Sequence, residues 1–484
     1  MNTDHLTLLT DLYELTMMQG YFKTGSHDVV VFDAFYRTNP DNGGYSICAG
    51  LAQIIDYIQH LQFDESDIAY LKSLGMFEDD FLEYLRTFRF SGDIYAIPEG
   101  TVIFPREPLV KVIAPIMEAQ FIETAILNIL NHQSLIATKA ARVCYAAGDD
   151  GVMEFGLRRA QGPDAGIYGA RAAVIGGCCG TSNVLCGKLF DIPVKGTHAH
   201  SWIMSFPDEY TAFQTYAKYY PSACILLVDT YLKSGIPNAI RVFQEMRDKN
   251  IPLTNYGIRM DSGDLAYLSK QARKMLDAAG FTDAVISASN DLDEYLIENL
   301  KAQGAVITSW GVGTNLITSK NTPAFGGVYK LTAIQNEQGE FVPKIKLSEN
   351  SEKVTNPGNK TIYRIYEKDS GKIKADLICL EGETFDCGKD LRIFDPLETW
   401  KYTNLTGGTY TMRRLPVQIF DKGQCIYQSP SVMKIQQYCR QEKDTLWNEV
   451  KRFSNPSKVY VDLSDNLFEM KRNILQELSA EHHQ

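Results

Sequence analysis

The sequence predicts an α/β protein with a parallel barrel at its centre, an N-terminal α/β domain before it and a smaller C-terminal region after it. Between residues 152 and 310, six short apolar runs alternate with helical stretches, which is the rhythm of a parallel sheet. The runs are mostly apolar, as expected of strands that helices cover on both faces. The chain has 484 residues, more than one hydrophobic core accommodates, so several domains are expected. The number of repeats favours a closed barrel over an open doubly wound sheet, which is the alternative.

Residues 1–130 are predicted to form the N-terminal α/β domain, because helical and strand-like periods are mixed there. The expected strands are 29–35, 94–97 and 109–113, and the expected helices are 51–62, 67–74, 78–88 and 118–147.

Residues 131–340 are predicted to form the barrel, and residues 341–484 a C-terminal domain that packs partly on the N-terminal one and ends in a helical tail. The expected barrel strands are 152–155, 193–196, 224–228, 256–260, 284–287 and 306–310, with a further strand at 328–334. In the C-terminal domain, strands are expected at 361–366 and 377–380, and helices at 432–450 and 465–478.

Composition narrows the functional class. The formal net charge of −11 argues against nonspecific binding to nucleic acid or to an anionic membrane. No apolar stretch is long enough to span a membrane, and the N-terminus lacks the pattern of a signal peptide. The ten cysteines include no Cys-x-x-Cys pair, which favours reduced thiols in a cytoplasmic protein. A zinc site made of Cys379, Cys387, Cys425 and Cys439 is disfavoured, because their spacing fits no common pattern.

The residues that follow the predicted barrel strands are rich in polar, ionisable and glycine residues. In a parallel barrel the active site lies at this end of the strands. The six segments in question are 155–159, 196–201, 229–230, 259–264, 289–291 and 311–315. A catalytic rim is therefore predicted where these segments meet.

The last of these segments has the character of a phosphate-binding loop. Gly311 and Gly313 allow backbone N–H groups to approach an oxyanion, and Thr314 adds a hydroxyl at an expected helix start. Ser289 and Asn290, at the preceding strand end, are assigned to the same phosphate site. Taken alone, the Gly-x-Gly-Thr segment is equally well explained as a tight turn.

Carboxylates also gather on the predicted rim. Asp229 and Asp261 close apolar strands and are suited to orienting sugar hydroxyls or holding Mg²⁺. Asp264 precedes the helix expected at 265–279, so a helix cap explains it as well as a metal role does.

Cations accompany these carboxylates. Arg158, Arg159 and Arg259 offer planar guanidinium groups that match a carboxylate or phosphate, with structural ion pairs as the alternative. His200 is a candidate base or nucleophile near neutral pH, against the ordinary alternative of a structural histidine. The combination predicts a site for a polyanion with a metal.

Seven segments resemble motifs of the nicotinate phosphoribosyltransferase family, in the family's order from about residue 9 to about residue 331; beyond residue 350 the resemblance is looser. They are 9–17 (LTDLYELTM), 155–163 (FGLRRAQGP), 180–184 (GTSNV), 196–201 (GTHAHS), 257–264 (GIRMDSGD), 311–315 (GVGTN) and 326–331 (GGVYKL).

The resemblance implies a type II phosphoribosyltransferase: an irregular TIM-like α/β barrel beside an N-terminal α/β domain, working as a homodimer with sites at the subunit interface. It implies a reaction of nicotinate with 5-phosphoribosyl 1-diphosphate that yields nicotinate mononucleotide and diphosphate in NAD salvage. ATP is expected as a co-substrate of this ligase-type reaction, whose hydrolysis is coupled through a phosphohistidine.

The resemblance also assigns residues to nicotinate. Tyr13, from the neighbouring subunit, matches an aromatic residue that stacks on the pyridine, and Phe155 matches the other face of that stack. Arg259 and Thr197 match nicotinate-contacting positions, and Arg158 fits the carboxylate or diphosphate region. Ser201 is assigned to substrate binding, and residues 311–314 match the 5′-phosphate loop.

His200 matches the phosphorylated histidine of the family. The reaction breaks a bond at the anomeric carbon, so Asp229 and Asp261 are expected to hold the ribose while charge develops there. Mg²⁺ is expected as the cofactor, held mainly through the diphosphate and not by protein ligands alone. Phosphorylation of His200 adds about two negative charges, which explains how ATP reorganises the site.

Three rival functions are weighed against this one. A nicotinamide phosphoribosyltransferase has the same fold, but the segments at 155–163 and 196–201 resemble the acid-specific family. A quinolinate phosphoribosyltransferase is usually a much shorter chain. A non-catalytic barrel that senses nucleotides is disfavoured because Tyr13, His200, Arg259 and Asp261 are all present.

Overall fold

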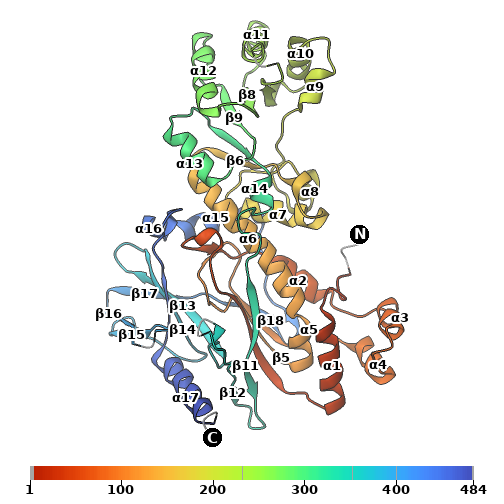
Figure 1. Cartoon of the computed structure of the whole chain (residues 1–484), viewed down its shortest axis with the longest axis vertical. Helices are drawn as coiled ribbons and strands as arrows, with labels where there is room; N and C mark the ends of the chain where they lie inside the picture. Colours follow the sequence, from red (N-terminus) through yellow and green to blue (C-terminus); the bar gives the residue numbers. More distant parts are fainter. Residues whose placement is uncertain (1–4, 232, 351–352, 399, 482–484) are drawn as a thin grey trace. The chain divides into compact units, whose positions relative to one another are not determined.

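The computed structural model describes residues 5–231, 233–350, 353–398 and 400–481. The chain divides into two compact units, which Figure 1 shows coloured by sequence. Unit 1 combines Met1–Leu135, Ala324–Pro430 and Gln437–Gln484, and unit 2 combines Ile136–Pro323 with Ser431–Gln436. In the described ranges, no helix has the length and apolar character needed to cross a bilayer.

The first sheet of unit 1 has seven strands and is antiparallel throughout. Its order is β12 (Phe341–Pro343), β11 (Gly327–Gln335), β1 (Val29–Tyr36), β5 (Val110–Pro115), β3 (Asp93–Ala96), β18 (Val417–Asp421) and β19 (Gln424–Cys425). The strands expected at 29–35, 94–97 and 109–113 are confirmed. The expectation that 328–334 belongs to the parallel sheet is wrong: this segment is β11, and it pairs antiparallel with β1.

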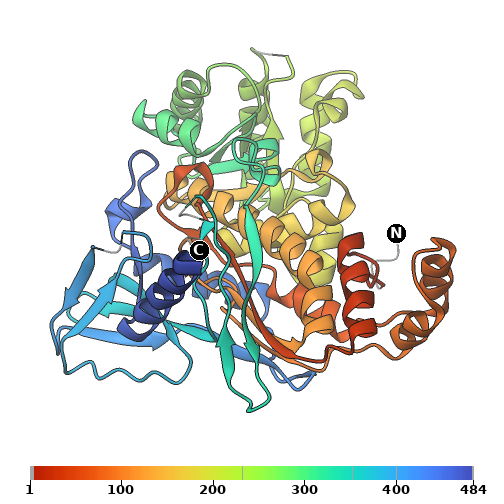
Figure 2. The ribbon, with the colours of Figure 1, turned by 60° about the horizontal axis from the view of Figure 1, so that its bottom comes forward.

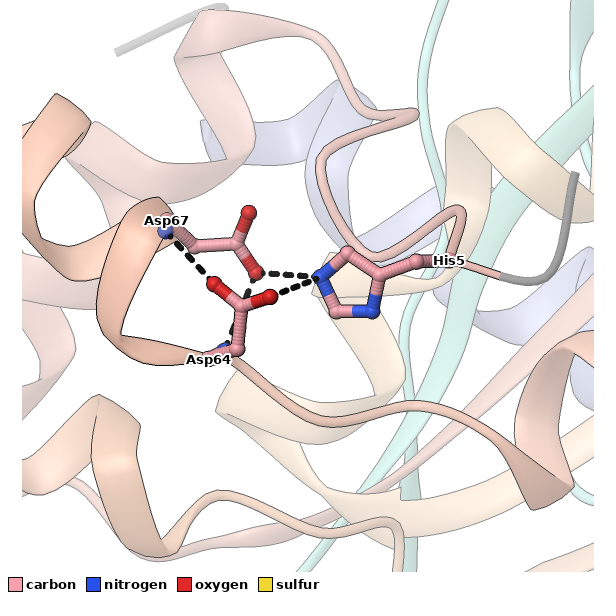
Figure 3. A group of neighbouring side chains, drawn as sticks. All are labelled: His5, Asp64 and Asp67. Carbon is pink, nitrogen blue, oxygen red and sulfur yellow. Dashed lines mark hydrogen bonds and ion pairs between the residues drawn. The ribbon is translucent and has the colours of Figure 1, made fainter. Parts of the chain in front are cut away.

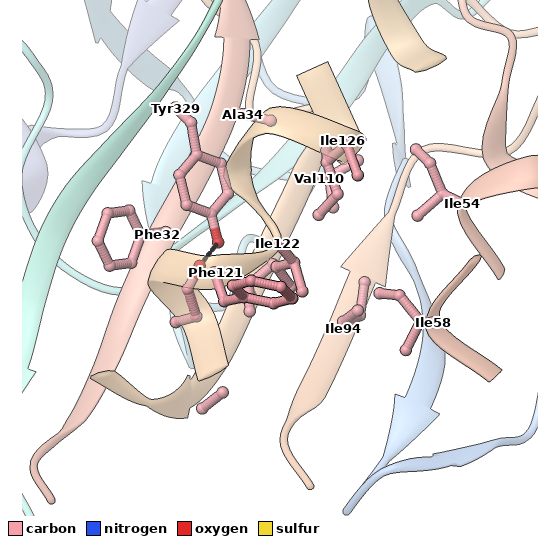
Figure 4. Close-up of a cluster of buried hydrophobic side chains, with 14 of the residues drawn as sticks. Phe32, Ala34, Ile54, Ile58, Ile94, Val110, Phe121, Ile122, Ile126 and Tyr329 are labelled. Carbon is pink, nitrogen blue, oxygen red and sulfur yellow. Dashed lines mark hydrogen bonds between the residues drawn. The ribbon is translucent and has the colours of Figure 1, made fainter. Parts of the chain in front are cut away.

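Strand β1 contributes to the hydrophobic core of this unit with one of its two faces, because successive side chains of a strand point to opposite faces of the sheet. Phe32 stacks on Tyr329 with ring centroids 4.6 Å apart, and the Tyr329 hydroxyl donates to the Ala119 carbonyl at 2.8 Å (Figure 4). Phe121 and Ile126 are buried in the same cluster. Asp33, on the opposite face of β1, is also buried.

The helices of the first 150 residues match the expected ranges except in two places: α1 lies where no helix was expected, and the last expected helix is interrupted. They are α1 (Leu12–Thr24), α2 (Leu51–Gln59), α3 (Glu65–Ser73), α4 (Asp79–Thr87), α5 (Ile116–Phe121) and α6 (Glu123–Ala147). The single helix expected at 118–147 is wrong in one detail, because α5 ends before α6 begins. Short strands β2 (Ser46–Ile47) and β4 (Val102–Ile103) pair with each other.

A second sheet of unit 1 comes from the C-terminal part of the chain. Its order is β16 (Tyr402–Leu405), β15 (Leu391–Phe394), β20 (Tyr460–Leu463), β14 (Ile373–Leu380), β13 (Lys360–Glu367) and β17 (Tyr410–Arg414). Helix α17 (Asp465–Glu481) packs against β14 and β15 (Figure 2). Helices α15 (Val432–Asp444) and α16 (Asn448–Lys451) replace the single helix expected at 432–450.

Arg364 of β13 is fully buried beside this sheet. It donates to both carboxylate oxygens of Asp376, at 2.9 and 2.7 Å, and to Glu442 at 3.1 Å. Glu107 lies 3.5 Å from the same guanidinium, and burial raises the pKa of Glu107 well above its usual value. One cation thus joins carboxylates from three separate parts of the chain.

Unit 2 is built on a five-stranded parallel sheet. Its order is β6 (Gly151–Glu154), β10 (Ser309–Val312), β9 (Val285–Ala288), β8 (Tyr256–Met260) and β7 (Cys224–Leu227). The helices between the strands are α7 (Pro163–Gly176), α8 (Val184–Phe190), α9 (His200–Met204), α10 (Glu209–Tyr219), α11 (Gly235–Asp248), α12 (Leu265–Ala278) and α13 (Glu294–Ala302), and α14 (Thr314–Ile317) follows β10.

Five of the six expected parallel strands are found, and the strand at 193–196 is not. The strand expected at 306–310 lies later in the chain, at Ser309–Val312, so Gly311 and Val312 belong to β10 and not to a loop after it. Only Val194 takes part in a parallel bridge there, with Thr181, which in turn bridges Glu154 at the end of β6. Pro193 lacks the N–H group that a ladder requires, which limits pairing in this segment. The named strands within the described residues therefore form an open row and no closed ring.

Candidate active site

The carboxyl ends of β7, β8 and β9 bring several predicted site residues together in unit 2. These strands are parallel neighbours, so their ends lie along one edge. Asp229 follows β7, Asp261 follows β8, and Ser289 follows β9. Hydrogen bonds join all three ends.

Asp229 organises the loop that follows β8. Its Oδ2 atom accepts from the Asp261 backbone N–H at 2.8 Å and from the Ser262 hydroxyl at 2.7 Å. Its Oδ1 atom is buried and has no hydrogen-bond partner among the described residues. One carboxylate oxygen is therefore anchored, and the other keeps its capacity to accept.

Arg259 forms the hub of this edge, which is the point where side chains from three segments meet its guanidinium. Its Nε atom donates to the Ser289 hydroxyl at 2.9 Å, and Nη1 donates to the Thr197 hydroxyl at 2.6 Å. Its Nη2 atom lies 3.5 Å from Asp261, whose carboxylate also accepts a short hydrogen bond from Ser289. The guanidinium thus links the 196–201 segment to the ends of β8 and β9, with a side chain that is 15% exposed.

His200 stands at the start of α9, between the two aspartates. Its Nδ1 atom is 3.0 Å from the Thr230 hydroxyl. Its Nε2 atom is 4.0 Å from Asp229 and 3.9 Å from Asp261. The side chain is 42% exposed, so the imidazole is open to a ligand. Ser201, the next residue of α9, is exposed.

His198, two residues earlier, has the opposite surroundings. Its ring is buried and meets the Tyr216 ring edge-on, with centroids 4.7 Å apart. Its Nε2 atom accepts from the Leu227 backbone N–H at 3.3 Å, and burial lowers the pKa of His198 to about 4. This histidine is neutral at pH 7 and completes hydrogen bonding at the edge strand β7.

The ends of β6 and β10 place Phe155 against the glycine loop. A side chain at Gly311 would have its Cβ atom 2.6 Å from the Phe155 ring, so only glycine leaves room for that ring. Thr314 begins α14, a helix of only four residues, so the helix dipole expected there is weak. Asn315 donates to the Asp291 and Leu292 carbonyls at 2.7 and 3.2 Å. It thereby ties the junction between β10 and α14 to the turn that holds Asn290.

Two residues important to this edge were not assigned from the sequence. Asn315 was visible only as part of a motif, because its role depends on contacts about 24 residues away. Glu154 ends β6 with a buried carboxylate that accepts from the Thr181 hydroxyl at 2.6 Å and from the Gly156 backbone, and burial raises the pKa of Glu154. A charged residue ending an apolar strand was the only available signal.

Arg158 and Arg159 lie in the short turn after β6 and are exposed. Within the described ranges, neither guanidinium forms an ion pair with the aspartates of the edge. The alternative explanation, that these two arginines serve in structural ion pairs with those aspartates, therefore has no support. They form an exposed cationic turn at the end of the same sheet.

Tyr13 lies on α1 in unit 1, whereas the other predicted site residues belong to unit 2. Its side chain is 45% exposed, and the pKa of its hydroxyl is raised to about 12, mainly by burial and then by the charges of Glu123 and Glu14. Leu12 and Met17 are exposed on the same helix.

One group of potential metal ligands occurs among the described residues, and it contains no predicted site residue. His5 Nε2 lies 2.7 Å from Asp67 and 3.5 Å from Asp64 (Figure 3). The two carboxylates also cap α3, since Asp64 accepts from the Asp67 backbone and Asp67 accepts from the Asp64 backbone. Capping of α3 and the contacts with His5 account for this group. The four cysteines considered as zinc ligands do not belong to it.

Family models match nearly the whole chain. The nicotinate phosphoribosyltransferase (NAPRTase) N-terminal domain matches residues 8–131, the nicotinate phosphoribosyltransferase (NAPRTase) family residues 151–374, and the nicotinate phosphoribosyltransferase C-terminal domain residues 359–471. A nicotinate phosphoribosyltransferase of Bacillus subtilis is 48% identical over 480 residues, covering 99% of this chain and 96% of that protein. One of Dictyostelium discoideum is 36% identical, covering 96% and 88%.

The comparison with solved structures agrees with these sequence matches. The crystal structure of human nicotinic acid phosphoribosyltransferase aligns with a TM-score of 0.83 at 28% identity, covering 96% of this chain and all of that one. A nicotinate-nucleotide pyrophosphorylase from Pyrococcus furiosus shares the fold, with a TM-score of 0.69 at 21% identity over 92% of this chain and 97% of that one. By its sequence matches, the chain belongs to the nicotinate phosphoribosyltransferase family.

Proposed function

We propose that this chain joins nicotinate to 5-phosphoribosyl 1-diphosphate and releases nicotinate mononucleotide and diphosphate, as a step of NAD salvage. The observation that carries the proposal is the hub at Arg259, where a largely buried guanidinium, two hydroxyls and a carboxylate meet at the carboxyl edge of the parallel sheet. This edge is built from the segments that resemble the family motifs.

In this proposal, Arg259 and Thr197 bind the nicotinate carboxylate, and the Phe155 ring packs on the pyridine. A guanidinium suits a planar carboxylate because its donors lie in one plane. Tyr13 of a second copy covers the other pyridine face, and its exposure on α1 is consistent with that role. Arg158, which is exposed in the turn after β6, contributes positive charge for the diphosphate.

The 311–314 segment, where β10 ends and α14 begins, takes the 5′-phosphate together with Ser289 and Asn290. Support comes from Asn315, which holds this segment and the 290–292 turn together, and from the absence of a side chain at Gly313, which precedes α14. Backbone N–H groups can approach an anion closely at such a glycine.

Asp229 and Asp261 hold the ribose while positive charge develops at its anomeric carbon. The free Oδ1 atom of Asp229 and the partly exposed carboxylate of Asp261 also fit the oxygen ligands that Mg²⁺ prefers. Mg²⁺, when bound with the diphosphate, neutralises the charge of that leaving group. The pyridine nitrogen is the nucleophile, so the contribution of the protein is chiefly to position the two substrates.

His200 is the proposed site of ATP coupling. A phosphoryl group passes from ATP to the imidazole with release of ADP, and water later releases phosphate from it. Exposure of the ring and its contact with Thr230 support this role, whereas the neighbouring His198 is buried and engaged with the backbone. A phosphate beside Asp229 and Asp261 repels both carboxylates, which gives ATP a means of reorganising the edge.

Two further structural proposals accompany the reaction. The single bridges at Thr181 and Val194 extend the row of strands beyond β6, which supports an irregular TIM-like barrel with weakly paired members. Exposed apolar residues support a homodimer: Leu12 and Met17 on α1, and Val184, Leu185 and Leu189 on α8.

The direct test is product formation by the purified chain. Incubation with nicotinate, 5-phosphoribosyl 1-diphosphate, Mg²⁺ and ATP is expected to yield nicotinate mononucleotide, measured by chromatography. Nicotinamide and quinolinate serve as parallel substrates under the same conditions. Consumption of nicotinamide but not of nicotinate would overturn the substrate assignment.

His200→Ala tests the coupling. We expect this variant to lose ATP hydrolysis and the stimulation of synthesis by ATP, while some ATP-independent synthesis remains. Acid-labile labelling by γ-³²P-ATP is expected to disappear as well. Undiminished stimulation by ATP would show that another residue carries the phosphoryl group.

A further inference from the structure

The segment 180–184 resembles a family motif, yet the proposed reaction gives it no role. It lies beside the end of β6, where Thr181 forms a parallel bridge with Glu154, the last residue of that strand. Two backbone hydrogen bonds of 3.0 Å flank this bridge, one donated by the Glu154 N–H group and one accepted by the Glu154 carbonyl. Phe155, the proposed partner of the pyridine ring, follows directly after the bridge.

The side chain of Glu154 adds a second link at the same place. Its carboxylate is fully buried. The Oε2 atom accepts from the Thr181 hydroxyl at 2.6 Å, and the Oε1 atom accepts from the Gly156 backbone N–H. Burial raises the pKa of Glu154, and both hydrogen bonds oppose that rise. One buried carboxylate therefore joins the 180–184 segment to the backbone on the far side of Phe155.

The Thr181 hydroxyl extends this link into the helices of unit 2. While it donates to Glu154, it accepts from the Asn183 backbone N–H at 3.0 Å. Asn183 caps α8 by accepting from the Cys186 backbone N–H, and it donates to the Gly166 carbonyl of α7, both at 3.1 Å. Thr181 and Asn183 are buried, so water does not replace a bond that either one loses. The carboxylate is thus anchored to two helices.

The residue between the two ends of this link is fixed by it. Glu154 and Gly156 are both held, so the backbone of Phe155 has little freedom to turn. The Phe155 backbone N–H also donates to the Val312 carbonyl at 2.8 Å, and its ring lies against Gly311. A side chain that contacts a substrate keeps its position when hydrogen bonds behind it hold its backbone and rotamer.

We propose that Glu154 is a positioning residue for nicotinate: its carboxylate, held by the Thr181 hydroxyl, fixes the Gly156 backbone and with it the Phe155 ring on which the pyridine packs. The inference rests on the proposed function, because it takes the contact of Phe155 with nicotinate from there. Glu154 and Thr181 act through Phe155 and not on the substrate directly. Small displacements of a positioned group weaken substrate binding and reaction, so this buried link matters for the reaction although it lies behind the site.

Two substitutions of Thr181 test the proposal by steady-state kinetics on the full chain. Thr181→Val removes the hydroxyl at nearly constant volume, whereas Thr181→Ser retains it. We expect the KM for nicotinate to rise roughly tenfold in Thr181→Val, as for one lost hydrogen bond to a charged group, while kcat at saturating nicotinate stays within about twofold. Thr181→Ser should return the KM to within about twofold of the wild type, because its hydroxyl can make both hydrogen bonds.

Ser269→Ala is the matched control for loss of a buried hydroxyl in unit 2. Ser269 is fully buried, donates to the Ala266 carbonyl and accepts from the Val306 backbone N–H, both at 3.1 Å. Its loss should destabilise the unit in thermal unfolding and leave the KM for nicotinate unchanged. An unchanged KM in Thr181→Val, no rescue by serine, or an equal rise in Ser269→Ala would overturn the proposal.

Glu154→Gln carries the test if Thr181→Val does not fold. The amide keeps the size of the side chain but offers one acceptor oxygen where two donors, the Gly156 N–H and the Thr181 hydroxyl, now bind. The KM for nicotinate should rise at least about threefold in this variant, and an unchanged KM would refute the positioning role.

Hydrogen exchange over residues 155–160, followed by mass spectrometry, separates this inference from the proposed function. Exchange should be faster in Thr181→Val than in the wild type and in Thr181→Ser, whether or not the protein makes the mononucleotide. A wild type that makes no mononucleotide would refute the proposed function, and the exchange rates would then still show whether the carboxylate holds this turn. An active wild type, with exchange and KM both unchanged in Thr181→Val, would refute the positioning role alone.

Discussion

Replacement of Arg259 by methionine is the most informative perturbation of the proposed site. The change removes the positive charge but keeps an unbranched side chain in a position that is 15% exposed. Two of the three guanidinium nitrogens already have close partners: Nε donates to Ser289 and Nη1 to Thr197. Only Nη2 lacks a partner closer than 3.5 Å, so one nitrogen is available to a substrate carboxylate.

That geometry sets the size of the expected effect. A hydrogen bond to a charged group contributes about 1.5–3 kcal/mol, so loss of one such contact should raise the KM for nicotinate roughly 10- to 150-fold. The KM for 5-phosphoribosyl 1-diphosphate should stay nearly constant. Any weak activity with the uncharged nicotinamide should be spared, because it gains nothing from the guanidinium charge.

The assay is steady-state formation of the mononucleotide with each base, for wild type and Arg259→Met. Arg241→Met is the control, since Arg241 is an exposed arginine of α11 in the same unit. A rise in the nicotinate KM of less than about threefold would refute the assignment. The carboxylate would then have to be held by Arg158 or Arg159, which are exposed at the end of β6.

Three other predictions follow from the surroundings of single residues. His198→Gln should retain acid-labile labelling by γ-³²P-ATP, because the wild-type ring is buried with a pKa of about 4 and only accepts from the Leu227 backbone; loss of label in a folded variant would contradict this. Burial raises the pKa of Glu14 from 4.5 to about 7, so its ionisation opposes folding, and wild-type stability should fall as the pH rises from about 4.5 to 7; Glu14→Gln should flatten this fall in urea titrations across that range, and an unchanged slope would count against it. Arg364→Met should lower the unfolding free energy by about 3–5 kcal/mol in denaturant titration, since it strands the buried carboxylates of Asp376 and Glu442, and a loss below about 1 kcal/mol would be inconsistent with their burial.

The parallel sheet was predictable because local apolar runs mark each of its strands. Strands β7 to β10 are short, buried and followed by helices, so their periodicity needs no knowledge of distant partners. The segment at 193–196 reads the same way, yet Pro193 leaves it with the single bridge at Val194. The segment at 328–334 also reads as a strand, but nothing local reveals that its partner is β1.

The candidate site was predictable to the extent that it follows the strand ends. That rule found Arg259, Asp229, Asp261 and Ser289, which the structure joins by hydrogen bonds. It did not separate His198 from His200, because burial and not sequence position distinguishes them. Family resemblance singled out His200, and the position of Tyr13 beside a second copy rests on that resemblance alone.

The pairing of β1 with β11 has a consequence for how the chain is made. Val30 and Ile334 are partners although about 300 residues separate them. At a synthesis rate of roughly 5–20 residues per second, β1 waits about 15–60 seconds on the ribosome for its neighbour. During that time one edge of a buried strand is exposed to other chains, which is a hazard for aggregation. Unit 2, by contrast, is almost one continuous stretch, so it can fold before the first sheet of unit 1 is complete.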